Sequence, residues 1–134
     1  MSNIKLNEKY MSLFSGDTRY YIVTGGRGSG KSFGVTLFLN NLTYENNHKV
    51  LFTRYTMSSA HSSIIPEFVD KIDVMGLQDD FRVTRDEIVN QTTDSAIMFK
   101  GIKTASGNQT AALKSLANVS TFVVDEAEEL VDEE

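Results

Sequence analysis

The sequence contains no cysteine and no long apolar segment. The lack of cysteine excludes disulfide frameworks, thiolate metal sites and cysteine nucleophiles. No apolar run approaches the roughly 20 residues that a membrane-spanning helix needs, and the N-terminus lacks the apolar core of a signal peptide. We therefore expect a soluble protein that binds no membrane and carries no visible export signal, which is compatible with a reducing cytoplasm.

The composition is that of a globular domain with its acidity at one end. Hydrophobic residues make up 40% and charged residues 23% of the 134 residues, a length that suits one domain. The net charge is −5, but seven of the 18 acidic residues lie in residues 125–134. The preceding 124 residues carry 13 basic and 11 acidic side chains. Such a mildly positive body neither requires nor excludes a phosphate-rich partner.

Predicted strands and helices alternate along the chain, which favours an α/β fold with a mainly parallel sheet. Runs of β-branched and aromatic residues predict buried strands at 20–24, 49–54 and 120–124. Helical spacing predicts helices at 7–14, 32–42 and 64–75, the last with Pro66 in its first turn. Short strands with polar turns are predicted at 81–83, 87–89 and 96–99, and further helices at 111–116 and 125–131.

A glycine-rich loop lies between the first predicted strand and the second predicted helix. Residues 25–32 read Gly-Gly-Arg-Gly-Ser-Gly-Lys-Ser and match the phosphate-loop pattern G-x-x-x-x-G-K-[ST] (Walker A) in the strand–loop–helix context that it requires. Such a backbone can direct successive N–H groups at an anion near the helix N-terminus. The predicted phosphate-binding residues are Gly25, Gly26, Arg27, Gly28, Ser29, Gly30, Lys31 and Ser32.

Two side chains of this loop have specific expected roles. Lys31 would reach the β- and γ-phosphates, and the hydroxyl of Ser32 would bind Mg²⁺. The alternative interpretation is a flexible glycine turn that contains an incidental lysine.

A pair of carboxylates follows the last predicted strand. Asp125 and Glu126 come directly after Phe122-Val123-Val124, and parallel α/β sheets place their ligand sites at the carboxyl ends of strands. Asp125 (Walker B) is a candidate ligand of the Mg²⁺ held by Ser32, and Glu126 a candidate base that polarises a water for attack on the γ-phosphate. The alternative is that both acids cap a helix N-terminus.

The Asp-Glu pair and the absence of an Asn-Lys-x-Asp sequence favour ATP hydrolysis over GTP binding or transfer of a phosphoryl group to a metabolite. The remaining acids, Glu128, Glu129, Asp132, Glu133 and Glu134, are interpreted as a solvated helix end.

These motifs together resemble the large terminase subunit of tailed bacteriophages over about residues 20–130. The resemblance rests on the loop at 25–32, a strand ending in Arg54, Ser62-Ser63, the segment 98–102, Leu113-Lys114-Ser115 and the segment 123–130. It implies a RecA-like P-loop ATPase, with ATP and Mg²⁺ as cofactors, that moves double-stranded DNA into a capsid. It also implies a homo-oligomeric ring in the host cytoplasm, with the portal protein and the small terminase subunit as partners.

The resemblance also assigns roles to single residues. Lys31 and Ser32 would bind phosphate and Mg²⁺, Asp125 would bind Mg²⁺, and Glu126 would be the catalytic carboxylate. Arg27 corresponds to a loop arginine that acts on the γ-phosphate, in its own subunit or in a neighbouring one; the alternative is a solvated or ion-paired arginine.

Other residues keep two interpretations. Arg54 would face nucleotide or a neighbouring subunit, or form a structural ion pair. Tyr10, Phe14 and Arg19 lie where the family contacts adenine, or they pack the first helix on the sheet.

The sequence departs from the family because the later sheet strands, the coupling segment and the nuclease domain are missing from it. In a RecA-like sheet another strand lies between the phosphate-loop strand and the Asp-Glu strand, and its omission leaves a gap of about 10 Å between them. We therefore expect residues 1–134 to be the N-terminal portion of a single P-loop ATPase domain that ends after the Walker B strand. The alternatives are another RecA-like DNA-dependent ATPase, such as a helicase or recombination factor, and a non-catalytic nucleotide-binding assembly fragment.

Overall fold

The computed structural model describes residues 8–14, 20–25, 30–54, 64–101 and 118–126. In chain order its elements are the 3-10 helix η1 (Glu8–Phe14), helix α1 (Lys31–Leu42), strand β1 (Lys49–Arg54), helix α3 (Ile65–Val74), the 3-10 helix η2 (Gln78–Asp80), and strands β2 (Phe81–Val83), β3 (Glu87–Asn90), β4 (Ser95–Gly101) and β5 (Thr121–Val124). Within these ranges no helix has the length and apolar character needed to cross a bilayer.

The five strands form one sheet in the order β2-β3-β4-β1-β5. Strand β1 is parallel to both of its neighbours, β4 and β5, whereas β2 and β3 continue the sheet in antiparallel pairing. The predicted α/β class is confirmed, but the sheet is mixed rather than mainly parallel. The reason is that the segment predicted at 96–99 is a longer strand, Ser95–Gly101, which pairs with β1 on one side and with the short antiparallel strand β3 on the other.

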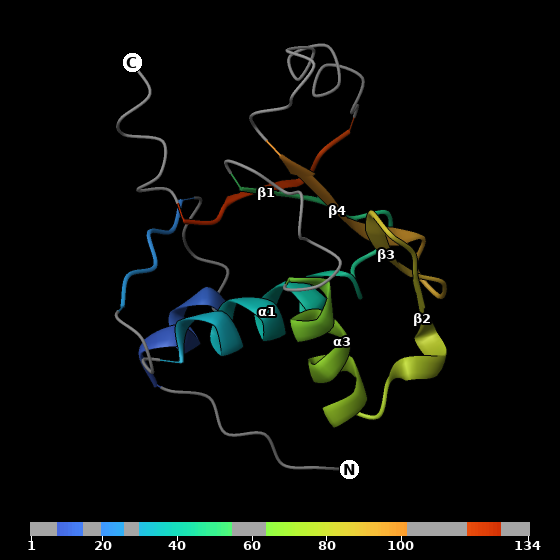
Figure 1. The fold of residues 1–134 in the computed structure, drawn as a ribbon, viewed down its shortest axis with the longest axis horizontal. Helices are drawn as coiled ribbons and strands as arrows, with labels where there is room; N and C mark the ends of the chain where they lie inside the picture. Colours follow the sequence, from blue (N-terminus) through green and yellow to red (C-terminus); the bar gives the residue numbers. More distant parts are fainter. Residues whose placement is uncertain (1–7, 15–19, 26–29, 55–63, 102–117, 127–134) are drawn as a thin grey trace.

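The core lies between this sheet and helices α1 and α3, which lie together on one side of the sheet in Figure 1. Helix α3 buries Ile65, Phe68 and Ile72, whose spacing puts them on one helix face. The ring of Phe68 meets those of Phe52 in β1 and Phe99 in β4 edge to face, at centroid distances of 5.6 and 5.3 Å. These aromatic contacts fix α3 against the two central strands.

The predicted helices at 32–42 and 64–75 are confirmed to within one residue at each end, and the helix predicted at 7–14 is the 3-10 helix η1. The strands predicted at 49–54, 81–83 and 87–89 are also confirmed. The predicted helix at 111–116 lies outside the described residues, as does most of the one at 125–131. The two described residues of the latter, Asp125 and Glu126, form a bend and not a helical turn.

Two predictions about strand burial are wrong. Residues 20–24 are not a strand, and Tyr20 and Ile22 are 78% and 93% exposed. Strand β5 forms as predicted, but its Phe122 is 58% exposed, because it lies on the edge strand and, paired with Leu51, points to the sheet face opposite α1 and α3. Side-chain type favours an extended backbone at 20–24, but a strand also needs a hydrogen-bonded neighbour, and none of the sheet pairings of the described strands includes this segment.

Candidate functional site

Helix α1 begins with the last two residues of the predicted phosphate loop, Lys31 and Ser32. Gly30 precedes the helix with φ +81°, a left-handed conformation that residues with a side chain adopt only at a cost. Among the residues that the structure describes, no side chain caps this helix N-terminus, and the first helical turn contains no acidic residue. Within that part of the chain, the first N–H groups of the helix therefore donate to no capping side chain, and no carboxylate of the first turn offsets the positive end of the helix dipole. Such a helix N-terminus is suited to binding an anion.

The other loop residues differ in what the structure says of them. Lys31 is half-buried and Ser32 is exposed, as a hydroxyl that binds an external ligand must be. Gly25 is described and exposed, whereas Gly26, Arg27, Gly28 and Ser29 lie outside the described residues.

The acid pair directly follows β5, and a backbone hydrogen bond holds its start against β1. The N–H of Asp125 donates to the carbonyl of Thr53 over 2.8 Å, so the β1–β5 pairing continues one step beyond Val124. The hydroxyl of Thr53 also donates to the carbonyl of Val123 over 2.6 Å. Glu126 follows with φ +52°, a left-handed conformation that is unusual for a residue other than glycine. The side chains of Asp125 and Glu126 are 32% and 45% exposed.

Arg54 connects the carboxyl ends of β1 and β5. Its Nε donates to Oδ2 of Asp125 over 3.0 Å, and its Nη2 contacts the same oxygen. The same Nη2 lies 3.7 Å from Oε1 of Glu126. The sequence left open whether Arg54 faces nucleotide, faces a neighbouring subunit or forms a structural ion pair. In the structure Arg54 forms an ion pair with Asp125.

The register of the sheet explains this contact. Thr53 is paired with Val124, so the next residues along the two parallel strands are Arg54 and Asp125. Equivalent residues on neighbouring strands point to the same face of a sheet. Val50 and Phe52 of β1 belong to the core beneath α1 and α3, so the alternation along the strand places Arg54, and Asp125 beside it, on the helix-covered face.

The loop end of α1 and the acid pair lie at the same end of the molecule. In Figure 1 the N-terminus of α1 and the carboxyl ends of β1 and β5 are all on the left of the view. The described residues contain no group of three or more His, Cys, Asp or Glu side chains able to hold a metal ion.

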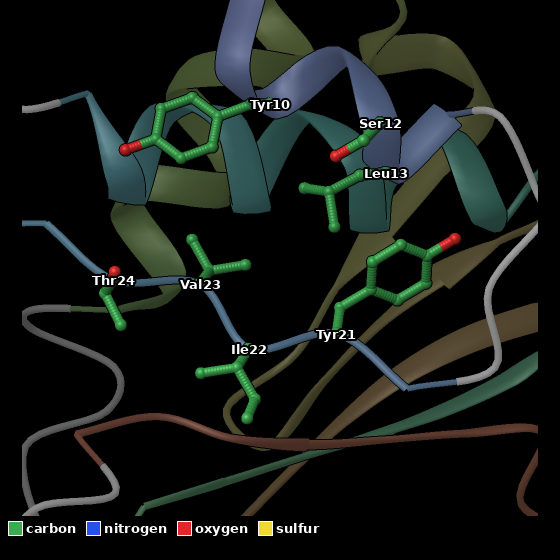
Figure 2. A pocket seen from close by; sticks show the side chains of 7 residues that line it. All are labelled: Tyr10, Ser12, Leu13, Tyr21, Ile22, Val23 and Thr24. Atoms are coloured by element: carbon green, nitrogen blue, oxygen red, sulfur yellow. The ribbon is translucent and has the colours of Figure 1, made fainter.

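A pocket of about 210 Å³ lies between η1 and residues 21–24, just ahead of the loop (Figure 2). Tyr10 lines it, but the Tyr10 side chain is almost fully buried and packs against α1, where a Cβ added to Gly34 would lie only 2.9 Å from the Tyr10 Cγ. Phe14 contacts Phe38 edge to face at 5.3 Å. In the structure Tyr10 and Phe14 thus pack the first helix, as one of the two interpretations had it, but they pack it on α1 and not on the sheet. Arg19 lies outside the described residues.

The comparison with protein families gives one finding that bears on this site. A family model described as phage terminase large subunit matches residues 17–134. The match includes the loop at 25–32, Arg54 and the acid pair. A search of curated proteins gives no match.

Proposed function

The chain belongs to the phage terminase large-subunit family, and from this premise we propose that residues 1–134 are the N-terminal portion of a P-loop ATPase domain that powers DNA packaging. The observation that carries the proposal is the uncapped start of α1, with Gly30, Lys31 and Ser32, at the same end of the molecule as the acid pair. A phosphate-binding helix terminus opposite two carboxylates is the arrangement that metal-assisted nucleotide hydrolysis needs.

The first half of the proposed site binds the triphosphate. The backbone of residues 25–30 and the N–H groups at the start of α1 hold phosphate oxygens, and Lys31 neutralises the charge of the β- and γ-phosphates. Arg27, from the middle of the loop, adds a second positive charge for the γ-phosphate, in its own subunit or in a neighbouring one.

The second half of the proposed site concerns Mg²⁺, which the available oxygen atoms fit. Mg²⁺ binds through one or two carboxylates together with substrate phosphates, and here the exposed Ser32 hydroxyl and Asp125 are the protein ligands. When bound, the ion would neutralise charge that develops on the phosphates. Glu126 would accept a proton from the attacking water, because its partly exposed carboxylate is adjacent to Asp125 in sequence and is not itself needed as a ligand.

We further propose the partners of the family for the whole protein: double-stranded DNA, the portal protein, the small terminase subunit and further copies of the same chain in a ring. A nuclease domain is not part of residues 1–134 in this proposal. The exposed Phe122 and the segment 20–24, which lies outside the described strands, are consistent with a further strand between β5 and that segment, as in a RecA-like sheet.

ATP binding and hydrolysis in three proteins test the proposal: the unmodified chain, Glu126→Gln and Lys31→Ala. We expect Glu126→Gln to bind ATP normally and to lose roughly 10²- to 10⁴-fold in hydrolysis rate, because only the proton acceptor is removed. Lys31→Ala should bind ATP roughly 10- to 100-fold more weakly, as expected when a charged partner of the phosphates is lost. Unchanged ATP affinity in Lys31→Ala would show that the loop is not the phosphate site.

The exposed edge of the described sheet at β5 favours a second candidate, a nucleotide-binding module without catalysis. In that case the unmodified chain and Glu126→Gln would bind ATP equally and neither would hydrolyse it. Stimulation of hydrolysis by double-stranded rather than single-stranded DNA would separate a packaging ATPase from a helicase-like ATPase.

A further inference from the structure

Arg54 contacts the carboxylates of both Asp125 and Glu126 in the described structure. Its guanidinium contacts Oδ2 of Asp125 through two nitrogens and lies 3.7 Å from Oε1 of Glu126. An arginine keeps its charge at all relevant pH values, so these contacts are independent of its protonation.

The surroundings of this pair make it stronger than an ordinary surface ion pair. The side chains of Arg54 and Asp125 are only 23% and 32% exposed, so solvent screens them less than it screens fully exposed charges. The backbone on both sides is also fixed, because the Asp125 N–H and the Thr53 hydroxyl tie β5 to β1. The ion pair therefore forms between two side chains whose backbone positions are already fixed by the pairing of β1 with β5.

A divalent cation would need the same carboxylate. Hydrogen bonds from Arg54 occupy lone pairs of Oδ2, and two positive groups close to one carboxylate repel each other. A metal that binds Asp125 through Oδ2 must therefore weaken or replace the contact with Arg54.

We propose that Arg54 is a positioning residue that holds Asp125 and Glu126 in the metal-free protein and competes with the nucleotide-bound metal for Asp125. The inference rests on the proposed nucleotide site. Release of Arg54 would then accompany metal binding, and the strength of the Arg54–Asp125 pair would set the metal affinity of the site.

The competition can be measured without any turnover. Mn²⁺, a spectroscopic substitute for Mg²⁺, is titrated into the ADP-bound chain while free Mn²⁺ is followed by electron paramagnetic resonance. ADP affinity is measured separately in EDTA. The variants are Arg54→Gln, which removes the charge, and Arg54→Lys, which keeps the charge but offers a single nitrogen. Arg82→Gln, at an exposed arginine in β2, is the matched control.

We expect Arg54→Gln to bind Mn²⁺ about fivefold more tightly than the unmodified chain, as the loss of a partly buried competing ion pair predicts. Arg54→Lys should lie between the two, because a single-nitrogen contact competes less well for Oδ2. Arg82→Gln should be unchanged. A gain in Arg54→Lys is the informative result, since a general electrostatic effect of Arg54 would leave this charge-conserving variant equal to the unmodified chain.

Three other outcomes overturn the inference. If ADP binds and Mn²⁺ affinity is equal or weaker in both Arg54 variants, Arg54 does not compete with the metal, although the proposed nucleotide site stands. If only Arg54→Gln gains affinity, the effect is one of charge and not of the contact. If the unmodified chain binds no ADP, the proposed function is wrong, and the inference about Arg54, which rests on it, is wrong as well. Circular dichroism of each variant checks folding, and Arg54→Lys decides the question if Arg54→Gln does not fold.

Discussion

Glu126 has a left-handed backbone at φ +52°, which costs roughly 1–2 kcal/mol for a residue with a Cβ. Glycine avoids this cost, whereas alanine does not. We therefore expect Glu126→Gly to be more stable than Glu126→Ala by about 1 kcal/mol in urea denaturation, although both variants lack the carboxylate. Equal stabilities of the two variants would mean that the conformation of residue 126 relaxes without cost.

Part of the candidate site could be predicted from single residues of the sequence. Residue type and position identified Lys31, Ser32, Asp125 and Glu126 as candidates, because each follows or precedes a recognisable element. The partner of Arg54 could not be predicted, since it depends on the register that pairs Thr53 with Val124. A shift of β5 by one residue would turn Asp125 to the other face of the sheet.

At the scale of elements, α1 serves two purposes that place different demands on its sequence. Its N-terminus is the proposed phosphate site, and its first turns provide the surface on which η1 packs. Gly34 lies at this contact, where an added Cβ would be 2.9 Å from Cγ and 3.0 Å from Cδ2 of the Tyr10 ring. The lack of a side chain at Gly34 thus allows the buried ring of Tyr10 to approach the helix.

The substitution Gly34→Ala tests this packing. Overpacking against Tyr10 costs about 1–3 kcal/mol, which outweighs the gain of up to about 1 kcal/mol in helix propensity, so we expect net destabilisation. In a Tyr10→Ala background the same substitution should be neutral or stabilising, because the clash is gone. Chemical denaturation of the four proteins measures both steps. Destabilisation of equal size in both backgrounds would contradict a direct contact between Tyr10 and Gly34.

The elements themselves were predictable to different degrees for physical reasons. Helix α3 and strand β1 have strong periodic or β-branched patterns and bury the faces that these patterns indicate. Strand β4 was predicted in the antiparallel group only, because local sequence cannot show that its second edge pairs with the distant β1. The described residues do not include 26–29 and 111–116, so the predictions for them stay predictions.

At the scale of the whole molecule, the two errors about burial have a common origin. The segment 20–24 and strand β5 each carry apolar side chains suited to a sheet interior, yet Ile22 and Phe122 are 93% and 58% exposed. Both patterns are consistent with a strand position between them, which the family resemblance supplies. The side-chain pattern thus predicted two buried strands, whereas the described sheet ends at β5 and does not include residues 20–24.

This exposed edge predicts how the 134-residue chain behaves in solution. An edge strand that carries an exposed phenylalanine promotes association between copies. We expect concentration-dependent self-association in sedimentation velocity, weakened roughly tenfold by Phe122→Lys, because a charge on the edge opposes pairing and apolar contact. Val83→Lys, at a comparably exposed apolar residue in β2 at the opposite edge of the sheet, is the matched control and should have a smaller effect. If the unmodified chain is monomeric, or if the two lysine substitutions have equal effects, copies of the chain do not associate through the β5 edge.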